Sequence, residues 1–311
     1  MQLVSALVTG GAGFVGSNLV DALLARGMKV TVLDDLSTGR EVNLESAVAA
    51  GAEFVHGDVA DATAVRDLFE RVRPRIVFHL AAQAQVNDSV NDPAADARVN
   101  VLGTIAVLEA ARATGVERFI YVSTGGAMYG EAGVYPTPET ALIRPESPYG
   151  ASKFAAESYV SMYVELHGLS TYTVRLANVY GPRQVPHSEG GVVAIFCERA
   201  LAGHIAQING DGEQTRDFVE VSDVVAALLL AGDSSVIGSC NIGRGEETSI
   251  NELVKTLGTL VPDGLEIKYG PSRGGEVRRS VLDPAKAFED FGWRAEVALH
   301  EGLSKTLDHF R

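Results

Sequence analysis

The sequence predicts an α/β fold of the Rossmann type, in which a smaller C-terminal domain is interleaved with a doubly wound parallel sheet. Short runs of β-branched residues alternate with amphipathic, Ala- and Leu-rich stretches along the first 176 residues. A glycine-rich turn joins the first run to the first helical stretch, and the sequence changes in character after Asn178. Such alternation is typical of βαβ units on a parallel sheet covered by helices.

Six short runs are expected to form strands of this sheet, at residues 6–9, 30–34, 53–57, 76–80, 118–123 and 172–176. Between them apolar residues recur at helical spacing, as at Ile105, Leu108 and Ala111. Later segments predict a helix at 192–202, turns at 209–216, a core helix at 221–231 and a strand at 239–242. We therefore expect one domain at 1–177 with about 219–241, and another at 178–218 and 242–311.

Composition restricts the classes of partner. The net charge of −14 disfavours nucleic acids and anionic membranes, because their phosphates would be repelled. The longest apolar stretch, near 224–231, is too short to span a bilayer, and no basic flank or cleavage site marks a signal peptide, so we expect a cytoplasmic protein. The two cysteines, Cys197 and Cys240, stand in unlike contexts and indicate buried thiols, with neither a disulfide nor a metal site.

The turn TGGAGFVG at residues 9–16 follows the first strand and opens the first helix. Gly10, Gly13 and Gly16 permit a tight turn, close approach of the backbone to a pyrophosphate, and close packing of helix on strand. Asp34 ends the second strand, eighteen residues after Gly16, where its carboxylate can bind both ribose hydroxyls of an adenosine. A carboxylate repels a 2′-phosphate, so NAD is favoured over NADP, although Arg40 lies close in sequence.

Two further segments carry candidate residues. Asp58 and Val59 follow the third strand, where they can meet the edge and face of an adenine; the alternative is an aspartate that caps a turn. In SPYGASK, Ser147 can cap a helix and Pro148 can take its first position.

Tyr149 and Lys153 then lie one turn apart on the same helix face. An ammonium beside a phenol is expected to lower the phenol's pKa from about 10 and produce a base usable near neutral pH. A hydroxyl at the end of the preceding strand, from Ser123 or Thr124, can hydrogen-bond a sugar oxygen and relay its proton.

The motifs resemble those of the extended short-chain dehydrogenase/reductase family and, within it, of UDP-glucose 4-epimerases. The resemblance covers nearly the whole chain and rests on TGGAGFVGSN, VLDDLSTG, HLAAQ, STGGAMYG, SPYGASK, RLANVYGPRQ, GDGEQTRDFVEVSDV and GEVRRSVLD. It implies that NAD is bound by Gly10, Gly13, Phe14, Val15, Gly16, Asp34, Asp35, Asp58, Val59, Leu80, Ala81, Ala82, Gln83, Asn100, Tyr149 and Lys153.

The same resemblance implies a catalytic set of Tyr149, Lys153, Thr124 and Ser123, of which we favour Thr124 as the hydroxyl. A UDP-sugar is expected to contact Gln85, Thr124, Gly125, Tyr149, Asn178, Arg183, Val192, Val193, Arg216 and Arg278. The two last arginines would place positive charge at the diphosphate inside an acidic protein. The first domain would then bind NAD and the second the nucleotide sugar.

The implied reaction is a 4-epimerisation by transient oxidation. Tyr149 takes the proton of the C4 hydroxyl while hydride passes from C4 to the nicotinamide. The resulting 4-keto sugar then rotates and is reduced on its other face. NAD is regenerated in each cycle and should stay bound.

Related sugar dehydratases and glucuronate decarboxylases resemble the chain but carry acidic residues after the catalytic hydroxyl, where this chain has Gly125 and Gly126. Epimerisation of UDP-glucuronate or of an N-acetylhexosamine stays open, because Val185, Ser188 and the run 83–85 depart from the usual hexose-epimerase pattern. A non-catalytic NAD-binding regulator is disfavoured, since such proteins usually lose the Tyr-Lys pair. Apolar faces at 101–113 and 154–166 indicate a homodimer formed through two helices per subunit.

Overall fold

The computed structural model describes residues 4–186, 191–262, 264–272 and 277–311. Two compact units share the chain. The first contains residues 1–124, 147–175 and 225–240, and the second contains 125–146, 176–224 and 241–311. The chain thus passes repeatedly between the two units, as the interleaved arrangement predicts. The second unit also takes in 125–146, a segment that the expected boundaries had left in the first domain.

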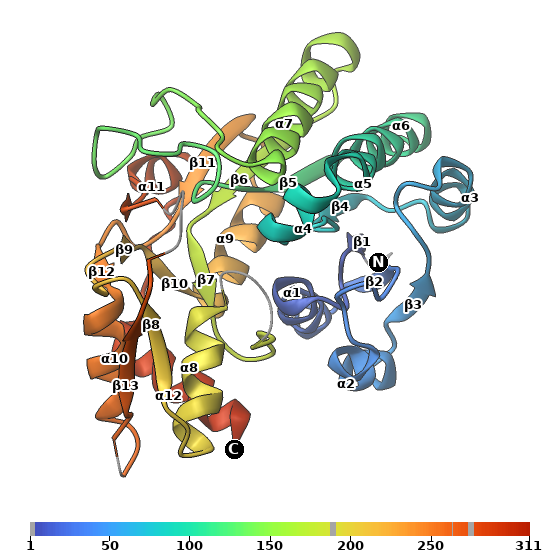
Figure 1. The fold of residues 1–311 in the computed structure, drawn as a ribbon. Helices are drawn as coiled ribbons and strands as arrows, with labels where there is room; N and C mark the ends of the chain where they lie inside the picture. Colours follow the sequence, from blue (N-terminus) through green and yellow to red (C-terminus); the bar gives the residue numbers. More distant parts are fainter. Residues whose placement is uncertain (1–3, 187–190, 263, 273–276) are drawn as a thin grey trace. The chain divides into compact units, whose positions relative to one another are not determined.

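The first unit is built on a seven-stranded sheet in the order β11-β6-β5-β4-β1-β2-β3 (Figure 1). Its strands are β1 (Ser5–Thr9), β2 (Lys29–Asp34), β3 (Glu53–His56), β4 (Ile76–His79), β5 (Arg118–Thr124), β6 (Thr171–Leu176) and β11 (Gly238–Ile242). The pairs β1–β2, β1–β4, β2–β3 and β4–β5 are parallel. The order of the first six strands is that of a dinucleotide-binding sheet, which confirms the predicted fold class.

Helices connect these strands. They are α1 (Phe14–Ala25), α2 (Glu45–Ala49), preceded by a short 3-10 turn η1 (Glu41–Leu44), α3 (Ala62–Val72), α4 (Val86–Asn91), α5 (Pro93–Ala97), α6 (Thr104–Thr114) and α7 (Pro148–His167). A π-helical turn, η2 (Arg98–Gly103), joins α5 to α6. Helices α3, α6 and α7 pack side by side (Figure 1) and bury their apolar faces in one core cluster with the strands.

The sequence explains where these helices begin and which face they bury. Asp61 caps α3 by accepting hydrogen bonds from the amides of Thr63 and Ala64, each at 3.0 Å. Val65, Leu68 and Phe69 follow at helical spacing, and all three side chains are buried. The cap fixes the start of the helix, and the spacing decides which side faces the sheet.

The second unit contains three small sheets and a separate core. β7 (Asn178–Tyr180) pairs with β10 (Phe218–Glu220), β9 (Thr215–Arg216) lies between β12 (Thr248–Ser249) and β14 (Arg279–Ser280), and β8 (Ala206–Asn209) pairs with β13 (Ile267–Gly270). Its helices are α8 (Val192–Leu201), α10 (Ile250–Gly258), α11 (Ala285–Phe291) and α12 (Leu299–Phe310), while residues of α9 (Val221–Asp233) belong to both units. Both cysteines are buried free thiols, as predicted.

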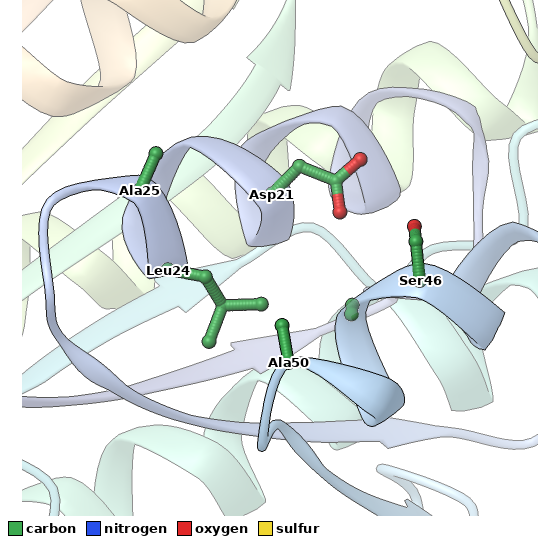
Figure 2. Close-up of a pocket in the computed structure, with 6 residues that line it drawn as sticks. Asp21, Leu24, Ala25, Ser46 and Ala50 are labelled. Carbon is green, nitrogen blue, oxygen red and sulfur yellow. The ribbon is translucent and has the colours of Figure 1, made fainter.

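A shallow cavity of about 390 Å³ lies between α1 and α2 (Figure 2). Asp21, Leu24 and Ala25 line it from α1, and Ser46, Ala47 and Ala50 line it from the other side. Asp21, Leu24 and Ala25 belong to the C-terminal half of α1, whereas the glycine turn lies at the N-terminal end of that helix. The cavity is therefore separate from the predicted site. Within the described ranges, no helix combines the length and apolar character needed to cross a membrane.

Leu108 offers a test of the first unit's core. Its side chain on α6 is fully buried in the core cluster, so Leu108→Ala should lower the free energy of unfolding by about 2–5 kcal/mol. The exposed Leu142 serves as the control, because Leu142→Ala removes the same atoms from a side chain that is 74% exposed. Urea denaturation measures the free energy of unfolding of both variants. Equal losses of stability would contradict the assignment of this core.

Candidate active site

The glycine turn after β1 adopts a conformation that requires glycine at two positions. Gly10 has a φ of +71°, and a Cβ there would lie 2.6 Å from the backbone nitrogen of Ala81. A Cβ on Gly16 would lie 2.1 Å from the carbonyl oxygen of Gly10. The turn therefore folds tightly onto the start of α1 and against the segment that follows β4.

The N-terminus of α1 suits a pyrophosphate. Gly13 is the N-cap residue and provides no side-chain cap, so the first amides of the helix, from Phe14, Val15 and Gly16, are not covered by a capping side chain. The helix dipole adds positive potential at the same place. The backbone found here fits the diphosphate of a dinucleotide.

Asp34 ends β2 beside this turn. Its Oδ2 accepts a hydrogen bond from the Ala12 amide and its Oδ1 from the Leu36 amide, both at 2.9 Å. Burial raises the pKa of Asp34, and these two amides act against that rise. A carboxylate has about four acceptor positions, so two remain for ribose hydroxyls. Its neighbour Asp35 instead accepts hydrogen bonds from the amide and hydroxyl of Ser37.

Asp58 and Val59 follow β3. The Asp58 carboxylate accepts a hydrogen bond from the Ala60 amide at 2.8 Å and forms an ion pair with Arg98, also at 2.8 Å. Burial acts to raise the pKa of Asp58, but the Ala60 amide and Arg98 hold it below its usual value. Asp58 thus makes the turn contact that was the alternative expectation. Val59 is buried in the core and lies close to Gly103.

A hydrogen-bonded network extends from the segment after β4, which contains Leu80, Ala81 and Ala82. The Gln83 amide donates to Asn100 Oδ1, and Asn100 Nδ2 donates to the Gln83 carbonyl oxygen, both at 2.9 Å. Asn100 Nδ2 also lies 3.0 Å from Ser152 Oγ on α7. Asn100 is part of the π-turn, a wider helical turn that often occurs at functional sites. The network connects the segment after β4 with the helix that carries Tyr149.

The predicted start of α7 is confirmed. Ser147 caps the helix by accepting a hydrogen bond from the Gly150 amide at 3.2 Å, and Pro148 takes the first position. The Tyr149 amide donates to Ser89 Oγ at 3.1 Å, which fixes the first turn against α4. Ser89 is not part of the predicted site, because no motif marks it.

The two candidate hydroxyls at the end of β5 differ in their surroundings. The Thr124 and Tyr149 side chains are hydrogen-bonded to each other. Ser123 is buried, and within the described part of the chain its Oγ has no hydrogen-bond partner. The structure therefore joins Thr124, rather than Ser123, to the tyrosine.

The expected low pKa of Tyr149 is wrong for the chain without ligands. Burial raises the pKa of Tyr149 to about 12, although the hydrogen bond from Thr124 acts to lower it. Burial also lowers the pKa of Lys153 to about 7, against the effect of the carboxylates of Glu157 and Asp96. Desolvation is thus the largest cause of both shifts.

Lys153 is 3% exposed and lies over an aromatic ring. Its Nζ is 4.3 Å from the centroid of Tyr121 on β5, within the range of a cation–π contact. His79, at the end of β4, lies between the hydroxyls of Thr9 at 2.6 Å and Thr104 at 3.0 Å. Burial, aided by the charge of Lys153, lowers the pKa of His79 to about 3, so this histidine is neutral.

The second unit contains most of the residues expected at the nucleotide sugar. Asn178 begins β7, and a Cβ on Gly126 would lie 3.8 Å from its Oδ1. Arg216 and Arg278 come together, because β9 and β14 are parallel neighbours and the Thr215 amide donates to the Arg278 carbonyl oxygen. Arg278 also binds Asp211 through two hydrogen bonds of 2.8 and 3.0 Å.

The remaining expected positions belong to other segments of the chain. Arg183 has a φ of +72°, a left-handed conformation in the loop before α8, and Val192 and Val193 form the first turn of that helix. Gln85 precedes α4 in the first unit and its carbonyl oxygen accepts a hydrogen bond from Gln83. Ser188, one of the residues on which sugar specificity was expected to depend, lies outside the described residues.

Gly16 allows a test of the turn. A Cβ at this position would collide with the backbone of Gly10, so Gly16→Ala should abolish dinucleotide binding by displacing the first turn of α1. Gly258→Ala is a matched control, because a Cβ there would lie 3.6 Å from its nearest neighbour. Titration with NAD, followed by protein fluorescence, measures the affinity of each variant for the dinucleotide, and thermal melting measures its stability. Retained affinity in Gly16→Ala would contradict this geometry.

Comparisons with known proteins agree with this geometry. The model of the NAD dependent epimerase/dehydratase family matches residues 6–243. The chain is 49% identical to a UDP-glucose 4-epimerase of Mycolicibacterium smegmatis, over 98% of both chains. It superposes on the UDP-glucose 4-epimerase of Thermotoga maritima with UDP-glucose at a TM-score of 0.95, with 46% identity and coverage of 99% and 98%. For the Thermus thermophilus UDP-glucose 4-epimerase complex with NAD the TM-score is 0.92, at 44% identity and 99% coverage of each chain. The chain therefore belongs to the NAD dependent epimerase/dehydratase family, as its motifs predicted.

Proposed function

We propose that this protein is an NAD-dependent 4-epimerase that interconverts UDP-glucose and UDP-galactose through a transient 4-keto sugar. The observation that carries the proposal is the hydrogen-bonded pair of Thr124 and Tyr149, one helical turn from Lys153, on a dinucleotide-binding sheet. Relatives named UDP-glucose 4-epimerase, at 42–49% identity over nearly the whole chain, support the substrate.

In this proposal the first unit holds NAD. The amides at the start of α1 bind the pyrophosphate, Asp34 binds the adenosine ribose, and Lys153 binds the nicotinamide ribose. Bound NAD supplies a hydride acceptor that becomes a hydride donor, so the sugar carbon is oxidised and then reduced. The second unit binds the nucleotide diphosphate through Arg216 and Arg278, whose guanidinium groups suit phosphate oxygens.

Tyr149 is the proposed base. It accepts the proton of the C4 hydroxyl during oxidation and returns it after the ketone has presented its other face. Thr124 is hydrogen-bonded to the sugar oxygen and to the phenol, and so relays the proton between them. Because the pKa of Tyr149 is about 12 in the chain alone, the tyrosine keeps its proton at neutral pH until positive charge is added beside it. Proton abstraction by Tyr149 therefore calls for positive charge beside the phenol, which bound NAD would supply.

The glycine at 125 supports an epimerase over a dehydratase. A Cβ there would lie 2.5 Å from Cδ1 of Leu282, and Leu282 is itself buried. The first side chain of the acidic pair of a sugar dehydratase, at 125, would therefore have to displace Leu282. UDP-glucuronate remains the second candidate, because the uncharged Val185 would not repel a carboxylate.

Proton NMR of the purified protein with UDP-glucose, and separately with UDP-glucuronate, tests the function. We expect conversion of UDP-glucose to UDP-galactose without added NAD. Tyr149→Phe should lower turnover by about 10²–10⁴-fold, the usual contribution of a positioned acid–base group. Thr124→Val should lower it far more than Ser123→Ala. If only UDP-glucuronate is converted, UDP-glucuronate is the substrate. If neither sugar is converted even with NAD supplied, the proposal is refuted.

We also propose that two copies of the chain associate through α7 and the π-turn before α6. Large apolar side chains are exposed there on α7 at Phe154, Met162 and Leu166, eight and four residues apart, together with Leu102 on the π-turn. Exposed apolar side chains on one helix suit the same side chains of a second copy. We place the protein in the cytoplasm, because its two free thiols fit a reducing compartment.

Leu166→Glu tests this association. The side chain is 65% exposed in the single chain, so a charge there costs the monomer little but would be buried in a dimer. Light scattering after size-exclusion chromatography should show a dimer for the unmodified protein and a monomer for the variant. Leu142→Glu, a change at another exposed leucine, should remain dimeric. A monomeric unmodified protein would contradict the proposal.

A further inference from the structure

Asp96 is a buried carboxylate that the reaction described above does not use. It lies on α5 and is 1% exposed. Its Oδ1 accepts hydrogen bonds from Gln83 Nε2 at 3.1 Å and Asn100 Nδ2 at 3.0 Å. Its Oδ2 has no hydrogen-bond partner among the described residues.

Hydrogen bonding alone does not account for a charged group at this position. Both donors approach one oxygen, and the oxygen of an amide would accept them without burying a charge. A buried carboxylate is costly unless a cation offsets it. Burial raises the pKa of Asp96, and the effects that oppose this rise come from Ser152, the charge of Lys153 and Gln83. The positive charge of Lys153 thus favours the ionised form of Asp96.

The other charged groups around Lys153 are already engaged. Glu157, one turn further along α7, is bound by Arg175 of β6 through Nε at 3.1 Å and Nη2 at 2.8 Å. From β4, His79 is neutral, and from β5, Tyr121 offers the face of its ring. Tyr149 lies on the same helix. Asp96, from α5, is thus the one carboxylate among these groups that is not paired with an arginine.

We propose that Asp96 is a positioning residue whose buried negative charge keeps Lys153 protonated, and which thereby sets the pH range in which Tyr149 and Lys153 work together. The hydrogen bonds of Asn100 to both Asp96 and Ser152 hold α5 against the helix that carries Lys153. This role in catalysis rests on the proposed epimerase function, while the effect on Lys153 does not.

The charge of Asp96 raises the pKa of both Lys153 and Tyr149. Turnover needs Tyr149 without its proton and Lys153 with it, so the two limbs of the pH profile report the titration of this pair. Removing the charge lowers both pKa values, and the whole profile moves to lower pH. A purely structural defect would lower kcat without moving both limbs together.

Asp96→Asn is the test, with two measurements on the NAD-loaded protein. The chain has six lysines, so ¹³C-labelled lysine allows the Lys153 Cε signal to be followed by NMR against pH. We expect its midpoint, and both limbs of the kcat profile, to fall by about one pH unit, the usual size of a nearby charge effect. Asp96→Glu should restore both. Asp88→Asn removes an exposed carboxylate of α4 and should leave both unchanged.

A Lys153 midpoint that is the same in Asp96→Asn and in the unmodified protein would overturn the proposal. If Asp96→Asn does not fold, Asp96→Ser removes the same charge, and the same fall in the Lys153 midpoint is expected of it. Absence of epimerase activity in the unmodified protein would refute the proposed function only, because the lysine titration requires no turnover.

Discussion

The backbone contact at Gly10 is the constraint on which the first unit's site depends. Because no side chain is present there, the turn after β1 lies directly against the segment after β4, where a Cβ would come within 2.6 Å of the Ala81 nitrogen. That segment continues to Gln83, which binds Asn100 through two hydrogen bonds, and Asn100 in turn binds Ser152 beside Lys153. The glycine turn and the catalytic helix are thus ends of one continuous network.

Burial of charge is the main cost of this arrangement. Lys153, Asp96, Glu157 and Arg175 are all buried in the first unit, and the bidentate contact of Arg175 with Glu157 neutralises one pair. Removing either partner of such a pair is usually far more damaging than its net contribution to stability. The proposed proton-transfer residues therefore lie beside buried charges, and the charge of each group depends on its neighbours.

The sequence predicted the strands well, since buried parallel strands are continuous runs of β-branched residues, and six expected runs agree closely with β1 to β6. The Rossmann order and the family followed from motifs. The π-turn was not predicted, because its residues have ordinary helical spacing and Val101 was expected in a regular helix. Asp96 was missed because no motif marks it, and the pKa of Tyr149 was misjudged because a sequence does not reveal how far a phenol is desolvated. The roles of Arg183, Arg216 and Arg278 stay predictions.

The contact between Gly125 and Leu282 has an evolutionary consequence. An acidic residue at 125 would have to displace the buried side chain of Leu282, since even a Cβ would lie 2.5 Å from its Cδ1. A smaller residue at 282 would make that space, but that change alone would leave a destabilising cavity. The two positions are therefore epistatic, because the cost of an acidic side chain at 125 depends on which residue stands at 282.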